Sequence, residues 1–395
     1  MIRLNISILF LFVSSLLFSQ KIAFDQGKIN QKNYYEEINF ELVNDKIMLP
    51  VVINNKTFTF LLDTGAPNVI SKTVLAEINV ENSKKINVSD ANNQSDEMEM
   101  VAIESMKLGN LSFDNTVALV SDLDNHFILK CFKMDGFIGS NLLRNSVIKI
   151  SLKDKKIIIT DDIKNLQTTA KPSKLLLVGE QKSPYVQINF SNNKKKKITE
   201  QALLDTGMDG FYEMSNRAFG ILSKENVWEE LSRSTGSSSI GLFGTAPLKE
   251  QILFKAPFLK LNDTTFENLI TNTTDDNNSR IGLDLLKHGD IIIDFKKKKF
   301  YFEAIENIIL DKKPPIYSAT IIDNKYSVGF VWDVTLRDKM NYGDEIIRVD
   351  SFVLEEMDFC DIVKIKNFRK GNQSYEIEVK SKDKTTNNTV LIQQQ

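Results

Sequence analysis

The chain is short of the residues on which most hydrolytic and metal chemistry depends. Among its 395 residues it has two histidines, His126 and His288, and two cysteines, Cys131 and Cys360. Serine and cysteine nucleophiles need a histidine base, and zinc sites usually take several histidine or cysteine ligands. We therefore expect no metal and no cofactor. If the protein is a hydrolase, carboxylates are its natural catalytic groups.

An excess of charge of one sign is also lacking. The chain has 50 basic and 52 acidic side chains, which gives a formal net charge of −2. Two lysine runs, at residues 194–197 and 296–299, fall where we expect solvent-exposed turns, and no aromatic residues interleave the first. This balance gives no general attraction to nucleic acid or to anionic membranes. We expect no nucleic-acid partner.

Long apolar runs are absent after the N-terminus. Residues 1–20, MIRLNISILFLFVSSLLFSQ, place one arginine before an apolar run that ends in small residues. This is the pattern of a secretory signal peptide, with cleavage expected near Ser19 or Gln20. The run from Ile6 to Phe18 is shorter than the ~20 residues of a membrane span, and an uncleaved anchor is the alternative. We expect a secreted or periplasmic protein without membrane attachment after cleavage.

The two cysteines lie far apart in the sequence. A secreted protein could pair them, but we expect Cys131 and Cys360 to lie in different domains. Two unpaired, buried thiols are the prediction.

The sequence contains an internal repeat. Its first copy includes KIMLPVVINNKTFTFLLDTGA and its second SPYVQINFSNNKKKKITEQALLDTGM. In each, an apolar strand, a polar turn and an alternating strand lead to an aspartate, Asp63 or Asp205, which indicates a hairpin. Each aspartate begins an Asp-Thr-Gly motif.

A second pair of matched segments follows the two Asp-Thr-Gly motifs. Aligned from Ile138 and Ile281 over 22 positions, nine residues are identical, and each segment predicts a glycine, a short helix, a strand, a basic turn and a strand. The spacing from aspartate to isoleucine is 75 residues in one copy and 76 in the other. Chance similarity of apolar hairpins is the alternative, and the matched spacing argues against it. We expect a tandem duplication with units at residues 21–165 and 166–310.

Paired Asp-Thr-Gly motifs indicate a specific chemistry. If the repeats pack about a pseudo-twofold axis, Asp63 and Asp205 meet there and share a proton. One carboxylate then takes a proton from a bound water while the other donates one to the substrate carbonyl. The glycines allow a close backbone approach, and the threonines can hydrogen-bond across the axis. The supporting residues are Thr64, Gly65, Ala66, Thr206 and Gly207.

These segments resemble the retropepsin and pepsin-like aspartic proteases. FLLDTGA and DGFIGSNLL match the family pattern in the first copy, and ALLDTGM and RIGLDLL match it in the second. The resemblance covers roughly residues 36–306 and implies a mainly β fold with two pseudo-twofold-related β-barrel lobes. It also implies a monomeric endopeptidase that cuts extended polypeptides in a cleft beneath flaps, without metal. Two residues depart from the pattern: Met208 replaces a small residue, and Arg280 replaces an apolar one.

Two segments are candidates for the flaps. Residues 234–247, STGSSSIGLFGTAP, interleave apolar side chains with glycine and serine, which suits a hairpin that covers a bound peptide. A flexible surface loop is the alternative. Residues 87–100 are the first-copy candidate and contain no glycine or tyrosine. The predicted substrate-binding flap residues are Ile240, Gly241, Leu242, Phe243 and Gly244.

The remaining residues, 311–395, have no counterpart in the repeat and begin with the linker DKKPP. The segment YGDEIIRVDS resembles the Gly-Asp-x-Ile segment of bacterial PDZ domains. The resemblance implies a small α+β domain that binds a peptide as an added strand, with residues 328–331 near the groove. A packing domain without a ligand is the alternative.

We expect an aspartic endopeptidase. A non-catalytic peptide-binding protein of the same fold is the alternative, although a binder has no need for two buried carboxylates. A carboxylate-based glycosidase would not require Thr-Gly after each acid.

Overall fold

The computed structural model describes residues 22–80, 82–304, 307–310, 312–364, 374–383 and 387–393. The predicted signal peptide, residues 1–20, lies outside the described residues. Strands dominate and the helices are short, which confirms the predicted mainly β fold. Within these ranges, no helix has the length and apolar character needed to cross a membrane.

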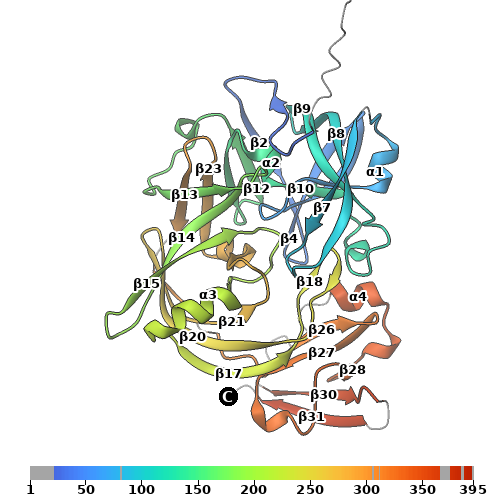
Figure 1. Cartoon of the computed structure of the whole chain (residues 1–395), viewed down its shortest axis with the longest axis vertical. Helices are drawn as coiled ribbons and strands as arrows, with labels where there is room; N and C mark the ends of the chain where they lie inside the picture. Colours follow the sequence, from blue (N-terminus) through green and yellow to red (C-terminus); the bar gives the residue numbers. More distant parts are fainter. Residues whose placement is uncertain are drawn as a thin grey trace, which may run out of the picture.

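The first lobe is a sheet with the strand order β1-β9-β6-β10-β5-β4-β8-β7, and β3 pairs with β4 at its side (Figure 1). Its short helices are α1 (Lys72–Ala76), η1 (Leu129–Phe132) and α2 (Ser140–Leu143). Its strands are β1 (Lys28–Ile29), β3 (Glu41–Val43), β4 (Lys46–Ile53), β5 (Lys56–Leu62), β6 (Val69–Ser71), β7 (Ser83–Ser89), β8 (Ser95–Leu108), β9 (Leu111–Ser121) and β10 (Gly136–Ile138).

The second lobe repeats the central pairings of the first, because β22 pairs with β15 and β16 as β10 pairs with β5 and β6. Its helices are α3 (Asn216–Leu222), η3 (Ser223–Glu225) and η4 (Leu283–Lys287). Its strands are β14 (Ser183–Ser191), β15 (Lys197–Leu204), β16 (Tyr212–Ser215), β17 (Glu229–Gly236), β18 (Ile240–Gly241), β19 (Gly244–Thr245), β20 (Lys249–Leu261), β21 (Thr264–Thr274), β22 (Arg280–Ile281) and β25 (Ile308–Ile309).

A bridging sheet joins the two lobes in the order β13-β24-β23-β11-β12-β2. Its strands are β2 (Tyr35–Asn39), β11 (Val147–Ser151), β12 (Lys156–Thr160), β13 (Ser173–Val178), β23 (Gly289–Asp294) and β24 (Lys299–Ala304), and η2 (Ile163–Asn165) precedes β13. In the repeat alignment Lys149 corresponds to Ile292, and these two residues are directly opposite in the antiparallel β11–β23 ladder. An antiparallel pair of equivalent strands centred on equivalent residues places a pseudo-twofold axis at this point.

The predicted hairpins are confirmed. Strands β4 and β5 meet at Asn54 and Asn55, which have left-handed φ values of 50° and 61°. Asparagine tolerates this conformation better than most residues, and two such residues match the twist of a two-residue hairpin. In the second lobe, β14 and β15 form the equivalent hairpin. Each hairpin carries its second strand into an Asp-Thr-Gly motif.

The tail forms its own sheet, in the order β26-β27-β28-β30-β31 with β29 on β28, and has a separate apolar core. Its elements are β26 (Tyr317–Ile322), β27 (Lys325–Val331), η5 (Val334–Leu336), β28 (Glu345–Val349), β29 (Phe352–Val353), η6 (Leu354–Glu356), α4 (Phe359–Lys364), β30 (Ser374–Lys380) and β31 (Asn387–Gln393). Figure 1 shows it in orange and red, below the first lobe and beside β17.

The tail contacts the second lobe through β27. Ser237 donates its N–H to the carbonyl of Gly329 at 3.2 Å, and Val331 donates to Ser234 Oγ at 3.1 Å. Residues 328–331, which we expected near a peptide groove, lie in a strand with neighbours β26 and β28. The pairing of β27 with β28 is at Ser327, while Gly329 and Val331 hydrogen-bond to the second lobe.

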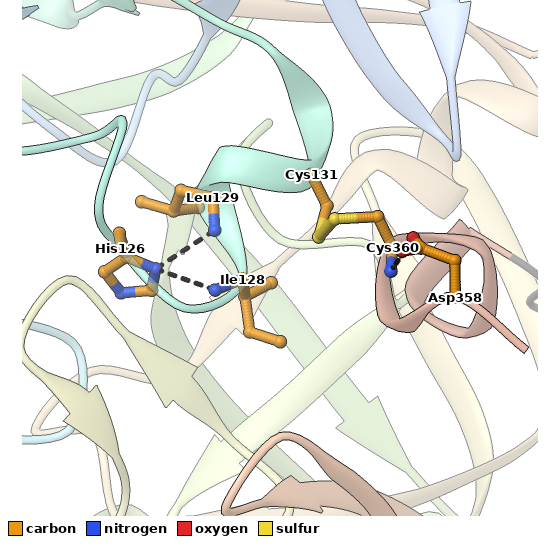
Figure 2. The surroundings of a disulfide bond; sticks show 6 residues. All are labelled: His126, Ile128, Leu129, Cys131, Asp358 and Cys360. Carbon is orange, nitrogen blue, oxygen red and sulfur yellow. Dashed lines mark hydrogen bonds between the residues drawn. A yellow bond between two sulfur atoms is a disulfide. The ribbon is translucent and has the colours of Figure 1, made fainter. Parts of the chain in front are cut away.

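Cys131 and Cys360 form a disulfide, with their Cα atoms 5.0 Å apart (Figure 2). The prediction of two unpaired thiols is wrong. Cys131 lies on η1 of the first lobe and Cys360 on α4 of the tail, so the bond closes a sequence separation of 229 residues. The sequence does not reveal that the tail folds back onto the first lobe, and this contact brings the two sulfurs together.

Candidate active site

Asp63 and Asp205 occupy equivalent positions in the two lobes. Asp63 directly follows β5 and donates its N–H to Ile138 O at 2.9 Å. Asp205 directly follows β15 and donates its N–H to Ile281 O at 2.8 Å. Each aspartate is thus fixed by the isoleucine of the Ile-Gly segment in its own lobe. The structure brings the two carboxyl groups together, within hydrogen-bonding reach of each other.

The two threonines hold the lobes together beneath the carboxyl groups. Thr64 donates its N–H to Thr206 Oγ1 at 3.0 Å, and Thr206 donates its N–H to Thr64 Oγ1 at 3.1 Å. Each hydroxyl also donates across the axis, Thr64 to Leu204 O at 2.6 Å and Thr206 to Leu62 O at 2.8 Å. Both side chains are buried. The symmetric set fixes the backbone of one motif against the other.

The glycines let each motif approach the opposite carboxyl group. Gly65 and Gly207 donate their N–H groups to Oδ1 of Asp63 and Asp205 respectively, each at 2.9 Å. A Cβ on Gly65 would lie 2.7 Å from Asp205 Cγ, and one on Gly207 would lie 2.6 Å from Asp63 Cγ. No side chain fits at these distances, so the close contact requires glycine at both positions.

The residues after the two glycines differ. Ala66 donates its N–H to Asp63 Oδ1 at 3.1 Å, which gives this carboxyl group a second backbone donor. Met208 instead donates its N–H to the backbone carbonyl of Asp205 at 3.2 Å. The dyad is therefore asymmetric in its hydrogen bonds, although its backbone follows the pseudo-twofold axis.

Asp63 retains a proton to near neutral pH. Burial and the negative charge of Asp205 raise the pKa of Asp63 to about 7, while Lys46 and the N–H of Gly65 act to lower it. Two carboxyl groups in contact cannot both ionise easily, so the pair holds one proton over a wide pH range. This is the protonation state that acid–base chemistry on a bound water requires.

Arg280 contacts the dyad and is a functional candidate that the sequence analysis missed. Its Nη1 lies 3.6 Å from Asp205 Oδ2, its Nη2 donates to Glu213 Oε2 at 2.9 Å, and its Nε lies 3.4 Å from Asp276 Oδ2. Burial alone would lower the pKa of Arg280, but Glu213, Asp205 and Asp276 raise it above the usual value. The sequence carried a signal, since a cation at an apolar position of a buried strand must find anionic partners.

Lys46 lies at the edge of the site. Its Nζ is 2.5 Å from Asp209 Oδ1 and also donates to the backbone carbonyl of Gly207. The residue begins β4 of the first lobe, while Gly207 ends the motif of the second lobe and Asp209 follows it. This interaction ties the lobes together beside the dyad. No motif in the sequence indicates this contact.

Both aspartates line a cavity of about 720 Å³. Its walls come from both lobes, from the turn after β7 and from the β18–β19 hairpin. Of the predicted site residues, those that line the cavity are Asp63, Gly65, Ala66, Asp205, Gly207, Ile240, Gly241 and Leu242. Thr64 and Thr206 lie buried beneath it. The cavity is large enough to hold several peptide side chains.

The predicted flap of the second lobe is fastened to the first lobe. Phe243 donates its N–H to Asp90 Oδ2 at 3.0 Å, and Asn92 Nδ2 donates to Gly244 O at 3.0 Å. Leu242 and Phe243 pack against the apolar cluster of the first lobe. The hairpin therefore spans the cavity from one lobe to the other. The turn it meets, between β7 and β8, belongs to the first-copy flap candidate.

His126 of the first lobe also contacts the flap. Its Nδ1 accepts the N–H groups of Ile128 and Leu129 at 3.2 and 3.0 Å (Figure 2). Its Nε2 lies 3.2 Å from Gly241 O. A carbonyl oxygen only accepts, so Nε2 carries the proton of a neutral ring. Burial lowers the pKa of His126, which favours that neutral form.

Among known proteins, the family similarity of this chain lies in the first lobe. Residues 49–142 match the family model described as Aspartyl protease. A solved structure, the aspartic proteinase from Irpex lacteus, is 13% identical with a TM-score of 0.42, over 69% of this chain and 97% of that chain. No curated protein sequence matches. The family match and the mainly β architecture together indicate an aspartic protease fold.

Proposed function

We propose that the protein is an aspartic endopeptidase with Asp63 and Asp205 as its catalytic dyad. One observation carries the proposal: two equivalent carboxyl groups meet in a cavity, and Asp63 retains a proton to about pH 7. The hydrogen bonds of Thr64 and Thr206 fix the geometry of the pair. The match of residues 49–142 to the aspartyl protease family model agrees with this function.

The chemistry follows from the two protonation states. The proton of the dyad is proposed to lie on Asp63, because burial and the charge of Asp205 raise the pKa of this carboxyl group. The cation of Arg280 lies beside Asp205, where it favours the negative charge. Asp205 takes a proton from a water that attacks the peptide carbonyl carbon, and Asp63 donates its proton to the carbonyl oxygen. The C–N bond then breaks as the amide nitrogen takes up the proton that Asp205 received, and Asp63 regains a proton from a hydroxyl group of the tetrahedral intermediate.

The proposed substrate is an extended polypeptide that lies between the lobes under the β18–β19 hairpin. Both carboxyl groups come from one chain, so catalysis requires no dimer and we propose a monomer. We also propose that the protein is secreted or periplasmic. The disulfide between Cys131 and Cys360 supports this location, because such bonds persist in oxidising compartments.

The tail is proposed to be a PDZ-like domain. Its sheet packs beside β17 through Ser237 and Gly329, close to the flap of the second lobe. A peptide ligand of the tail remains part of the proposal, with a packing role as its alternative.

Proteolysis by the purified chain from residue 21 tests the function. The wild type should cleave a library of unstructured peptides between acid and neutral pH, while Asp63→Asn and Asp205→Asn should each lose the activity by at least ~1,000-fold. Asp338→Asn, which changes an exposed carboxylate of the tail, is the matched control and should cleave as the wild type does. Wild-type protein that binds these peptides without cutting them would support the non-catalytic alternative. Unchanged cleavage by both dyad variants would refute the assignment of the dyad.

A further inference from the structure

The cavity is chemically asymmetric, and the strand registers show where the asymmetry arises. In the first lobe, Phe137 of β10 pairs with Leu61 of β5. In the second lobe, Arg280 of β22 pairs with Leu203 of β15. Leu61 and Leu203 each lie two residues before a dyad aspartate. Phe137 and Arg280 are therefore equivalent positions on opposite sides of the dyad.

The same comparison identifies a second exchanged position. Val69 of β6 pairs with Phe137, whereas Glu213 of β16 pairs with Arg280. Val69 and Glu213 thus have the same place in their lobes. An apolar pair on one side of the dyad is replaced by an ion pair on the other.

A third position is exchanged on the hairpin strands. Met48 of β4 pairs with Leu61, whereas Tyr185 of β14 pairs with Leu203. The hydroxyl of Tyr185 donates to Asn278 Oδ1 at 2.8 Å, so this side chain adds polar contacts rather than sulfur and methyl groups. All of these residues line the cavity. Three equivalent positions therefore change from apolar to polar between the lobes.

The first-lobe wall forms an apolar site. Beyond the exchanged positions Met48, Val69 and Phe137, this wall includes Leu119 and Met134, which belong to the same apolar cluster of the first lobe as those three residues. Leu242 of the flap packs on this cluster from above. A large apolar side chain gains free energy here by leaving water, at about 25 cal/mol per Å² of apolar surface.

The second-lobe wall forms an anionic site. Arg280 is a single cation in contact with three carboxyl groups, those of Glu213, Asp276 and Asp205. Glu213 is bound through Oε2, and its side chain remains 29% exposed at the cavity wall. Lys46 also lines the cavity, but its ammonium group is paired with Asp209. A further anion would meet net repulsion here, whereas a cation or a hydrogen-bond donor meets carboxylate oxygens.

We propose that the cleft selects polypeptides with a large apolar residue on one side of the scissile bond and a basic or hydrogen-bond-donating residue on the other. The apolar residue occupies the first-lobe site, and the basic residue contacts Glu213 in the second-lobe site. This inference rests on the proposed function, because it takes the dyad as the position of the scissile bond.

Peptide binding to the Asp63→Asn variant tests the selectivity separately from catalysis. The probes are labelled hexapeptides with central Phe-Lys, Lys-Phe, Phe-Asp, Asp-Phe or Phe-Phe, and dissociation constants come from fluorescence polarisation. One of the two orders of Phe and Lys should bind at least about tenfold more tightly than Phe-Asp, Asp-Phe or Phe-Phe. The lysine gains a charge-assisted hydrogen bond at the second-lobe site, where aspartate meets repulsion and phenylalanine gains no hydrogen bond. Equal affinities, or tightest binding of Phe-Phe, would overturn the inference.

A second substitution locates the preference on the second lobe. Glu213→Val in the Asp63→Asn background installs the side chain of the equivalent first-lobe position, and Glu213→Gln removes only the charge. Both should reduce the advantage of the lysine peptide to about threefold or less, and the valine variant should gain affinity for Phe-Phe. Asp338→Asn in the same background is the control and should keep the full advantage. An advantage that survives both changes at Glu213 would refute its role.

Cleavage-site profiling of the wild type then separates the two proposals. Sites with an apolar residue on one side and a basic residue on the other support both. Sites with apolar residues on both sides leave the protease function standing and overturn the selectivity. Selective binding by Asp63→Asn without any wild-type cleavage overturns the protease function and keeps the asymmetric cleft.

Discussion

Thr64 and Thr206 each donate a backbone N–H to the other's hydroxyl oxygen, at 3.0 and 3.1 Å. Each hydroxyl then donates to the residue two positions before the other threonine, Leu204 or Leu62. Rotation about the pseudo-twofold axis maps this set of four hydrogen bonds onto itself. It couples the two motifs directly, so the separation of the carboxyl groups depends on these four hydrogen bonds.

Replacing either threonine by valine should destabilise the fold and impair catalysis. Thr64→Val leaves the N–H of Thr206 and the carbonyl of Leu204 buried without partners, at a cost of about 2–4 kcal/mol in the free energy of unfolding. Thr64→Ser keeps the hydroxyl and should restore most of the stability. Urea unfolding measures these differences. Thr73→Val, at an exposed position, is the control. Equal losses of unfolding free energy in Thr64→Val and Thr73→Val would contradict the account.

An added methyl group at the motif glycines should separate the carboxyl groups. Gly65→Ala places Cβ 2.7 Å from Asp205 Cγ, so the motif must shift. Because the geometry of reacting groups controls the rate steeply, kcat/KM should fall by at least ~100-fold. Gly220→Ala, in α3 with open space around it, should leave kcat/KM unchanged. Comparable rates for the two variants would show that the close contact is not required.

Much of the fold could be predicted from the sequence because the relevant signals are local or repeated. Alternating strands and polar turns predicted both hairpins, which are present as β4–β5 and β14–β15. The equal spacing between each aspartate and its Ile-Gly segment reflects a real contact, since Asp63 and Asp205 donate their N–H groups to Ile138 and Ile281. Repetition thus pointed to both halves of the candidate site.

The remainder depends on contacts between segments that no local pattern connects. The disulfide requires the tail to reach η1, and neither cysteine has a sequence context that predicts this. Arg280 was visible as a departure from an apolar pattern, but its partners Glu213 and Asp205 lie on or next to other strands and become apparent only in three dimensions. Likewise, the hydrogen bond between Phe243 of the flap and Asp90 joins residues of different lobes, so no local pattern predicts it.

Removing the cation beside the dyad should shift the pH dependence of catalysis. Arg280 Nη1 lies 3.6 Å from Asp205 Oδ2, and a cation beside the dyad favours its charged form, so Arg280→Leu should move the pH–rate profile to higher pH. The variant also leaves Glu213 and Asp276 without their buried partner, which should cost about 3–5 kcal/mol of stability. Arg217→Leu, at an exposed site on α3, should change neither quantity. A pH–rate profile that does not move would contradict the contact between Arg280 and the dyad.

The disulfide should be present in the protein isolated under oxidising conditions. Alkylation in denaturant without reductant should modify no cysteine, and prior reduction should expose both, as intact mass will show. Cys131→Ser with Cys360→Ser should lower the free energy of unfolding by about 2–5 kcal/mol and make the tail more sensitive to limited proteolysis. Two alkylated cysteines in the unreduced sample would show that the thiols are free.

The pH dependence of kcat/KM for peptide cleavage tests the central claim most directly. Catalysis by Asp63 and Asp205 requires one proton on the pair, and the pKa of Asp63 is about 7. Between pH 3 and 9, kcat/KM should therefore decline as the pH rises through about 7, toward a tenfold loss per pH unit. Asp63→Asn should show no measurable cleavage at any pH. A rate constant that stays level or rises between pH 6 and 9, or cleavage by Asp63→Asn with the wild-type profile, would contradict catalysis by this dyad.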